Sequence, residues 1–262
     1  MSCPTVRDVI AWLDALLDPT RRPDYGPNGL QVDASPPSLG FAGQPVSSIV
    51  TGVTANLALI ELAIERGADL LVVHHGLYWK DAPVTATGML GRRLARCFES
   101  RLSIAGYHLP LDAHPEVGNA AGLADALGLV DQRPAFLYMG LPTGCIGRFP
   151  EPLDSRQLEA RLLYLSPRAL LFPGGPSSIS SVGIVTGGAP RLAHEAADLG
   201  LDLFVTGECT EFTQALAAER GLHLAAAGHH RTEVFGPKRL AARLRDAFPD
   251  VEVEFVDVDN PA

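Results

Sequence analysis

Two adjacent histidines, His74 and His75, follow an apolar run and stand directly before a glycine. The run, Leu70-Leu-Val-Val73, predicts a buried parallel strand. Both imidazoles would then lie at the carboxyl end of that strand, where open α/β sheets place their ligands. Because neighbouring side chains on a strand point to opposite faces, two histidines in a row cannot share one face. They could serve two different metal ions, or one could bind while its neighbour packs.

A second doublet, His229-His230, also follows an apolar stretch, and Glu233 comes four residues after its first member. Between the doublets, His108 and Asp112 repeat the same spacing after another strand-like run. A spacing of four places two side chains on one face of a helix or a strand, so each pair could converge on one centre. Imidazole and carboxylate donors without thiolates suit Zn, Fe, Mn or Co.

The chain contains one pattern of elements twice, at residues 48–73 and 181–206. Each copy has a β-branched strand running into Thr-Gly, a helix-length stretch, the sequence Gly-x-Asp-Leu and a second apolar strand, which is the βαβ pattern. In this register the first doublet corresponds to Gly207-Glu208, and the pair His108 and Asp112 corresponds to His229 and Glu233. The alternative is that βαβ units resemble one another in any α/β protein.

We therefore predict an α/β fold of two related halves, each a central sheet with βαβ units and flanking helices. The halves, residues 1–140 and 141–262, would pack about a pseudo-twofold axis with the metal site between them. The 262 residues allow one large domain or two smaller ones. Helix signals favour helices at residues 119–127 and 237–248, and one at 6–17 with Thr5 as its cap.

Composition narrows the class of protein. The chain is 47% hydrophobic and 19% charged, which is typical of a soluble globular protein. No apolar run is long enough for a membrane span, no leader is evident, and four scattered cysteines favour reduced thiols, so we expect a cytoplasmic protein. The net charge of −9 argues against broad binding to nucleic acid, whereas bound dications would attract a small anion.

Several further residues have two interpretations. Glu208 could move a proton or orient a ligand, or it could be a helix-start carboxylate. His108 could hydrogen-bond Asp112 or pack, and we favour a supporting or proton-transfer role over ligation. His230 would support the site or face a substrate. Tyr78, Trp79 and Lys80 could form the wall of a pocket for an aromatic base or simply pack, and Arg231 could meet a phosphate or be solvated. We expect His114 to be a surface residue after a turn. His194 and His223 have a structural interpretation.

Taken together, the motifs resemble the NIF-three-like dinuclear-metal proteins, often labelled GTP cyclohydrolase I type 2 homologues. The resemblance covers the whole chain and is closest to the compact bacterial branch without an inserted domain. The motifs that carry it are His74-His-Gly-Leu-Tyr-Trp79, Tyr107-His-Leu-Pro-Leu-Asp-Ala-His-Pro-Glu116, Thr206-Gly-Glu208, Ala227-Gly-His-His-Arg-Thr-Glu233, Tyr25-Gly-Pro-Asn-Gly-Leu-Gln31 and Asn260-Pro261-Ala262.

The resemblance implies two divalent metal ions per chain. His74, Asp112 and Glu233 would hold one ion, and His75, His229 and Glu233 the other, so that Glu233 bridges. It also implies a ring-shaped homohexamer with the metal centres facing an internal cavity. It does not supply a secure reaction.

Two functional classes remain. Two bridged dications activate water and polarise a carbonyl or phosphoryl oxygen, which favours a hydrolase acting on a small nucleotide-like or phosphorylated molecule. Alternatively, the metal centre is structural or regulatory, and the ring is a scaffold for partner proteins. Loss of turnover with a chelator would indicate the enzyme.

Overall fold

The chain divides into two compact units that do not follow the sequence in order. The structure, a computed structural model, describes residues 3–21 and 23–262. Unit 1 comprises Met1–Leu111 and Pro237–Val258, and unit 2 comprises Asp112–Gly236 and Asp259–Ala262. The division therefore differs from the expected boundary at residue 140, and it places Asp112 in unit 2 rather than with the first half.

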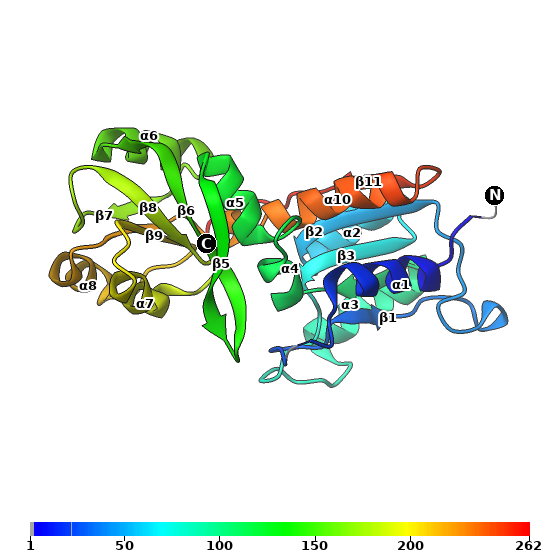
Figure 1. Ribbon diagram of the computed structural model, residues 1–262. Helices are drawn as coiled ribbons and strands as arrows, with labels where there is room; N and C mark the ends of the chain where they lie inside the picture. Colours follow the sequence, from blue (N-terminus) through cyan, green and yellow to red (C-terminus); the bar gives the residue numbers. More distant parts are fainter. Residues whose placement is uncertain (1–2, 22) are drawn as a thin grey trace. The chain divides into compact units, whose positions relative to one another are not determined.

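Unit 1 is built on a five-stranded sheet (Figure 1). Four of its strands run parallel, and the fifth, at one edge, is antiparallel to its neighbour. In spatial order the strands are β1 (Gly29–Val32), β4 (Ser103–Gly106), β3 (Leu70–His75), β2 (Ser48–Thr54) and β11 (Glu252–Phe255). The predicted strand before the first histidine doublet is thus β3, at the centre of this sheet.

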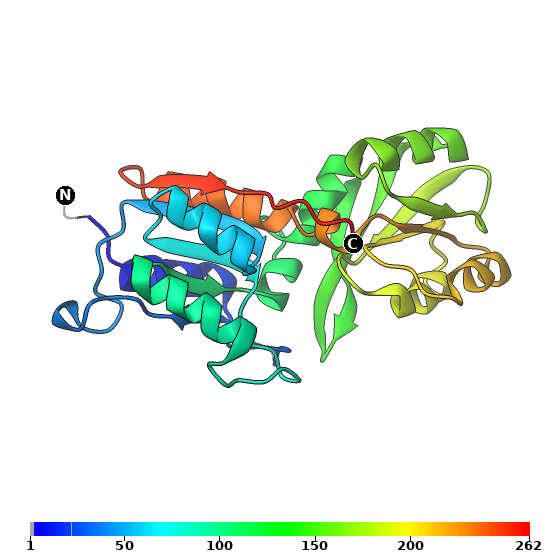
Figure 2. The same ribbon diagram turned by 180° about the vertical axis from the view of Figure 1, so that it is seen from behind.

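Helices cover both faces of the unit 1 sheet. The helices α2 (Leu57–Glu65) and α3 (Gly88–Ser100) bury apolar side chains against one face. On the opposite face lie α1 (Val6–Leu17) and α10 (Phe235–Ala247), as Figures 1 and 2 show from the two sides. Burial on both faces agrees with the unbroken burial of β2 from Ile49 to Val53 and with the four successive apolar residues that begin β3, Leu70–Val73.

Unit 2 is built on a six-stranded mixed sheet. Three parallel strands form its centre, flanked by antiparallel strands on both sides. In spatial order the strands are β5 (Val130–Tyr138), β6 (Leu141–Leu153), β8 (Ile179–Ile184), β9 (Leu203–Thr206), β10 (His223–Ala226) and β7 (Leu170–Phe172).

The unit 2 sheet is also covered on both faces. One apolar cluster joins the sheet to α5 (Asn119–Leu127) and α6 (Ser155–Leu165), and a second joins it to α7 (Ala193–Asp198) and α8 (Thr213–Arg220). Each unit's set of parallel strands is followed along the chain by one short helix. These are α4 (Leu109–Ala113), after β4, and α9 (His229–Thr232), after β10.

The two units repeat one succession of elements. A helix leads to an antiparallel edge strand and then to three adjacent parallel strands, as α1, β1 and β2–β3–β4 in unit 1 and as α6, β7 and β8–β9–β10 in unit 2. The strand register agrees as well, because Leu70 lies opposite Ile49 in unit 1 and Leu203 lies opposite Val182 in unit 2. The repeated pattern in the sequence therefore reflects a repeated structure.

The elements that follow each repeat are exchanged, which explains the displaced boundary. Helix α5 follows the first repeat but packs in unit 2, whereas α10 and β11 follow the second repeat and pack in unit 1. Sequence continuity cannot reveal such an exchange, because each segment has the same apolar pattern in either place. Within the described part of the chain, no helix is long and apolar enough to cross a membrane.

Candidate metal centre

His74 and His75 are the last two residues of β3. His74 is fully buried, and its Nδ1 lies 3.1 Å from the carbonyl oxygen of Tyr107. The carbonyl only accepts, so Nδ1 carries the proton and Nε2 carries the lone pair that a metal needs. Nδ1 of His75 lies 3.1 Å from the Thr54 hydroxyl, which can anchor this ring in the same way.

The two rings lie side by side, and a third imidazole joins them. The ring centroids of His74 and His75 are 4.5 Å apart, and that of His108 lies 5.0 Å and 5.6 Å from them. One ligand atom from each of the three lies within 4.8 Å of the others. The two rings thus come close together although the residues are successive positions of one strand, and their service to two different metal ions stays a prediction.

His108 is held by a carboxylate that no motif in the sequence singled out. Its Nδ1 lies 2.7 Å from Asp24, whose side chain is 3% exposed and also accepts a hydrogen bond from the Leu109 N–H. Burial would raise the pKa of Asp24, but the hydrogen bond and charge of His108, with the Asn28 amide, hold that pKa below its ordinary value. The partner of Nδ1 is thus Asp24 rather than the expected Asp112.

The segment that contains Asp24 packs under the ends of β3 and β4. Asn28 accepts a hydrogen bond from the His108 N–H at 2.7 Å, and Gln31 accepts one from the Leu77 N–H at 2.7 Å. A Cβ at Gly76 would lie 2.2 Å from the Gln31 amide, so only glycine lets that side chain pass. The motif from Tyr25 to Gln31 therefore supports the histidines.

Trp79 packs against the same cluster. Its ring lies 5.6 Å from that of His75 and 5.1 Å from that of His108, edge to face in both cases. Tyr78 and Trp79 line a small cavity together with His74 and His108, whereas Lys80 is exposed. The aromatic pair thus both packs and forms a wall beside the imidazoles.

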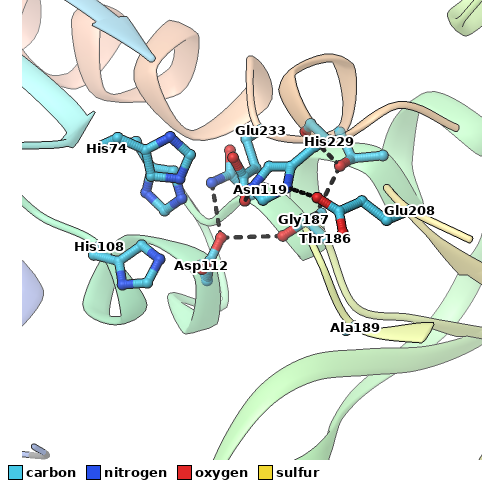
Figure 3. A network of polar contacts seen from close by, with 12 residues as sticks. His74, His108, Asp112, Asn119, Thr186, Gly187, Ala189, Glu208, His229 and Glu233 are labelled. Carbon is cyan, nitrogen blue, oxygen red and sulfur yellow. Dashed lines mark hydrogen bonds and ion pairs between the residues drawn. The ribbon is translucent and has the colours of Figure 1, made fainter. Parts of the chain in front are cut away.

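In unit 2, His229 lies between two carboxylates (Figure 3). Its Nδ1 is 2.6 Å from Glu208, and its Nε2 is 3.2 Å from Glu233, which is 2% exposed. Burial alone would lower the pKa of His229, but the hydrogen bonds and charges of Glu233 and then Glu208 raise it to about 9. Glu208 is not a helix-start residue, because α8 begins only at Thr213.

A glycine makes room for this group. Gly187, just beyond β8, has a φ of +67°, and a Cβ there would lie 2.3 Å from Oε1 of Glu233 and 3.2 Å from Nε2 of His229. The Gly187 N–H donates to the Thr232 hydroxyl at 3.0 Å, which ties this turn to α9. Any side chain at Gly187 would displace the buried carboxylate.

Asp112 is the fourth carboxylate of interest and lies in unit 2. Its Oδ1 accepts hydrogen bonds from the Asn119 amide at 2.9 Å and from the Thr186 hydroxyl at 3.0 Å (Figure 3). Asp112 and Asn119 are buried. The spacing in the sequence pointed to Asp112 but to neither Asn119 nor Thr186.

The other predicted residues take varied positions. His230 is buried, and its backbone N–H donates to the carbonyl of Ala262. His223 is buried against the carbonyl of Pro176, and His194 is exposed. His114 accepts hydrogen bonds from backbone N–H groups two and three residues further on, which is a turn role. Arg231 lines a cavity in unit 2.

Comparison with known proteins shows the family. A sequence model of the family described as Duf34/NIF3 (NGG1p interacting factor 3) matches residues 4–261. A protein of Allochromatium vinosum named a GTP cyclohydrolase 1 type 2 homolog is 40% identical over 258 residues, covering 98% of this chain and 97% of that protein. One of the same name from Pasteurella multocida is 42% identical over 242 residues, covering 91% and 92%. The chain belongs to the Duf34/NIF3 family, which confirms the resemblance seen in the motifs.

The chain is also similar over nearly its whole length to solved structures. A protein described as ybgI, of unknown function, has a TM-score of 0.90 and 36% identity over 99% of this chain and 100% of its own. The protein TTHA1606 from Thermus thermophilus has a TM-score of 0.84 and 35% identity over 99% of both chains.

Both units carry donors that suit a divalent metal. Unit 1 offers three imidazoles, and unit 2 offers the His229 imidazole with the carboxylates of Asp112 and Glu233. Burying a carboxylate without a positive charge beside it costs free energy. The protonated imidazole of His229 supplies that positive charge to Glu233. A divalent metal ion in place of that proton would also put a positive charge beside Glu233, so these residues suit a metal ion.

Proposed function

We propose that this chain binds two divalent metal ions and hydrolyses a small nucleotide-like or phosphorylated molecule. His74, Asp112 and Glu233 hold one ion in this proposal, and His75, His229 and Glu233 hold the other. Glu233 is therefore the bridge, and Zn, Fe, Mn and Co all suit the donor set.

The observation that carries the proposal is the environment of Glu233. Its carboxylate is buried, Nε2 of His229 faces it, and Gly187 leaves space that any other residue would fill. Ligating histidines commonly donate their second nitrogen to a carboxylate or a carbonyl. His229 has this arrangement with Glu208, and His74 has it with Tyr107.

When bound, the two ions would supply Lewis acidity and activate water near neutral pH. The chain's own residues then position and move protons. Glu208 fixes the tautomer of His229 through Nδ1, and Asp24 does the same for His108. Nε2 of His108 would take up or release a proton at the substrate, because Asp24 holds Nδ1 protonated.

The substrate class follows from charge and from the relatives. With a net charge of −9, the protein depends on bound dications to attract an anion. The name GTP cyclohydrolase 1 type 2 homolog, given to the relatives, favours a nucleotide among such anions.

A second candidate function is a metal-binding ring that serves as a scaffold. The family description, an interacting factor, favours this alternative. In either case we propose a homohexamer in the cytoplasm. The four free cysteines fit a reducing compartment.

The deciding experiment compares turnover by metal-loaded wild type and Glu233→Ala on GTP and a phosphoester panel, with and without chelator. Glu219→Ala, which removes an exposed carboxylate on α8, is the matched control. The hydrolase proposal predicts turnover by wild type and Glu219→Ala that disappears with chelator and in Glu233→Ala. Turnover that survives in Glu233→Ala would show that this centre is not the catalyst, and no turnover by fully loaded wild type would favour the scaffold.

A further inference from the structure

Asn119 is a fully buried amide at the start of α5, and both ends of its side chain are used. Its Oδ1 accepts a hydrogen bond from the Gly236 N–H at 2.6 Å, and its Nδ2 donates to Oδ1 of Asp112 at 2.9 Å. A backbone N–H only donates and a carboxylate only accepts, so these partners fix the orientation of the amide. No exchange of the amide nitrogen and oxygen would satisfy both of them.

Asn119 connects the surroundings of two proposed ligands within unit 2. One partner is Asp112 itself, and the other, Gly236, lies three residues beyond Glu233. Asp112 and Glu233 are far apart in the sequence, and the Asn119 amide hydrogen-bonds to the segment of each. Asn119 is therefore one of the contacts that hold the segments of these two carboxylates together.

The same contacts hold one particular oxygen of Asp112, Oδ1. Oδ1 receives two hydrogen bonds, from Asn119 and from the Thr186 hydroxyl. A metal ion bound through Oδ2 leaves both bonds intact, whereas one bound through Oδ1 competes with two donors. Hydrogen bonds of this kind orient ligating carboxylates, and their loss typically costs about 10–100-fold in metal affinity.

We propose that Asn119 is a positioning residue that presets Asp112 against Glu233 for one of the two metal ions. The inference rests on the proposed function, since it assumes that both carboxylates bind metal. Thr186 assists by holding the same oxygen of Asp112. Neither residue would touch the metal or the substrate.

Asn119→Asp is the sharpest variant because it preserves size. Its carboxylate still accepts from the Gly236 N–H but opposes the Asp112 carboxylate, where the amide donates. Thr186→Val removes one hydrogen bond from Asp112 without affecting Gly236. Asp154→Ala is the control, since it removes the side-chain cap of α6 in the same unit, where Asp154 accepts from the Gln157 N–H at 2.8 Å.

The test is titration of each full-length variant with Co²⁺, followed by calorimetry and by the visible absorption of the bound ion. We expect wild type and Asp154→Ala to bind two Co²⁺ per chain alike. We expect Asn119→Asp to bind one of them about 10–100-fold more weakly, with an altered absorption band, and Thr186→Val to shift in the same direction by less. A merely structural role would lower thermal stability without changing that band.

Unchanged affinity and absorption in a folded Asn119→Asp would overturn the inference while leaving the proposed function standing. Failure of wild type to bind any Co²⁺ would overturn the proposed function and this inference with it. If Asn119→Asp does not fold, Thr186→Val decides: a band like that of wild type counts against the proposal.

Discussion

Nδ1 of His229 lies 2.6 Å from a carboxylate oxygen of Glu208, while Nε2 of the same ring lies 3.2 Å from Glu233. Both nitrogens face carboxylates, so the ring carries a proton on each of them when no metal is bound. The pKa of His229 is raised to about 9, because the two carboxylates favour the charged imidazole by more than burial disfavours it. A metal ion at Nε2 must displace one of these protons.

The first prediction concerns pH. Because the folded-state pKa of His229 lies above the ordinary value of about 6.5, its charge stabilises the fold fully below pH 6.5. That stabilisation is lost as the pH rises through about 9. Denaturant unfolding of chelator-treated wild type and His229→Gln, from about pH 6 to about pH 10, should show the two free energies of unfolding converging as the pH rises. Curves that stay parallel would contradict the assignment.

The second prediction concerns Gly187. Gly187→Ala adds a Cβ that would lie 2.3 Å from Glu233, so we expect metal affinity to fall by at least about tenfold. Gly200→Ala is the matched control, because its φ of +68° matches the +67° of Gly187 but nothing lies within 4 Å of the added atom. Gly200→Ala should lose about 1–2 kcal/mol of stability through its positive φ alone, and Gly187→Ala should lose more, because its Cβ also meets Glu233. Equal metal affinity in the two variants would show that the space at Gly187 does not matter to the site.

The third prediction concerns Asp24. Asp24→Asn keeps the size of the side chain but removes the charge that holds Nδ1–H of His108 at 2.7 Å. We expect the His108 imidazole to lose its fixed tautomer, because charge-assisted hydrogen bonds are roughly twice as strong as neutral ones. The imidazole ¹⁵N chemical shifts measure this directly. Asp246→Asn, at an exposed position of α10, should leave them unchanged, and a His108 signal like that of wild type in Asp24→Asn would count against the pairing.

Local sequence signals were enough for many of the elements. Thr5 caps α1 with a full capping box, and the helix spans Val6–Leu17 as predicted. Helix α5 likewise has the predicted bounds, and α10 begins at Phe235 rather than at Pro237. Proline fits there because the first turn of a helix has no use for its missing N–H. These features depend on residues a few positions apart, which a sequence displays directly.

The supporting contacts of the site could not be predicted in the same way. Asp24 and His108 are 84 residues apart, and Asn119 and Gly236 are 117 apart. Nothing in the local pattern of either partner points to the other, because only the folded backbone brings them together. The position of Glu208 near the site was predictable, since in the internal repeat it corresponds to the second histidine of the first doublet. The exchange of α5 with α10 and β11 between the two units could not be predicted from the sequence.

The proposed two-metal centre bridged by Glu233 is tested most directly by the metal content of the protein. Wild type, His75→Ala and Glu233→Ala are loaded with Zn²⁺, dialysed and measured by elemental analysis against protein concentration. We predict two ions per chain in wild type, partial retention of one ion in His75→Ala and loss of both in Glu233→Ala, since only Glu233 serves both ions. Two ions retained in a folded Glu233→Ala would contradict the claim.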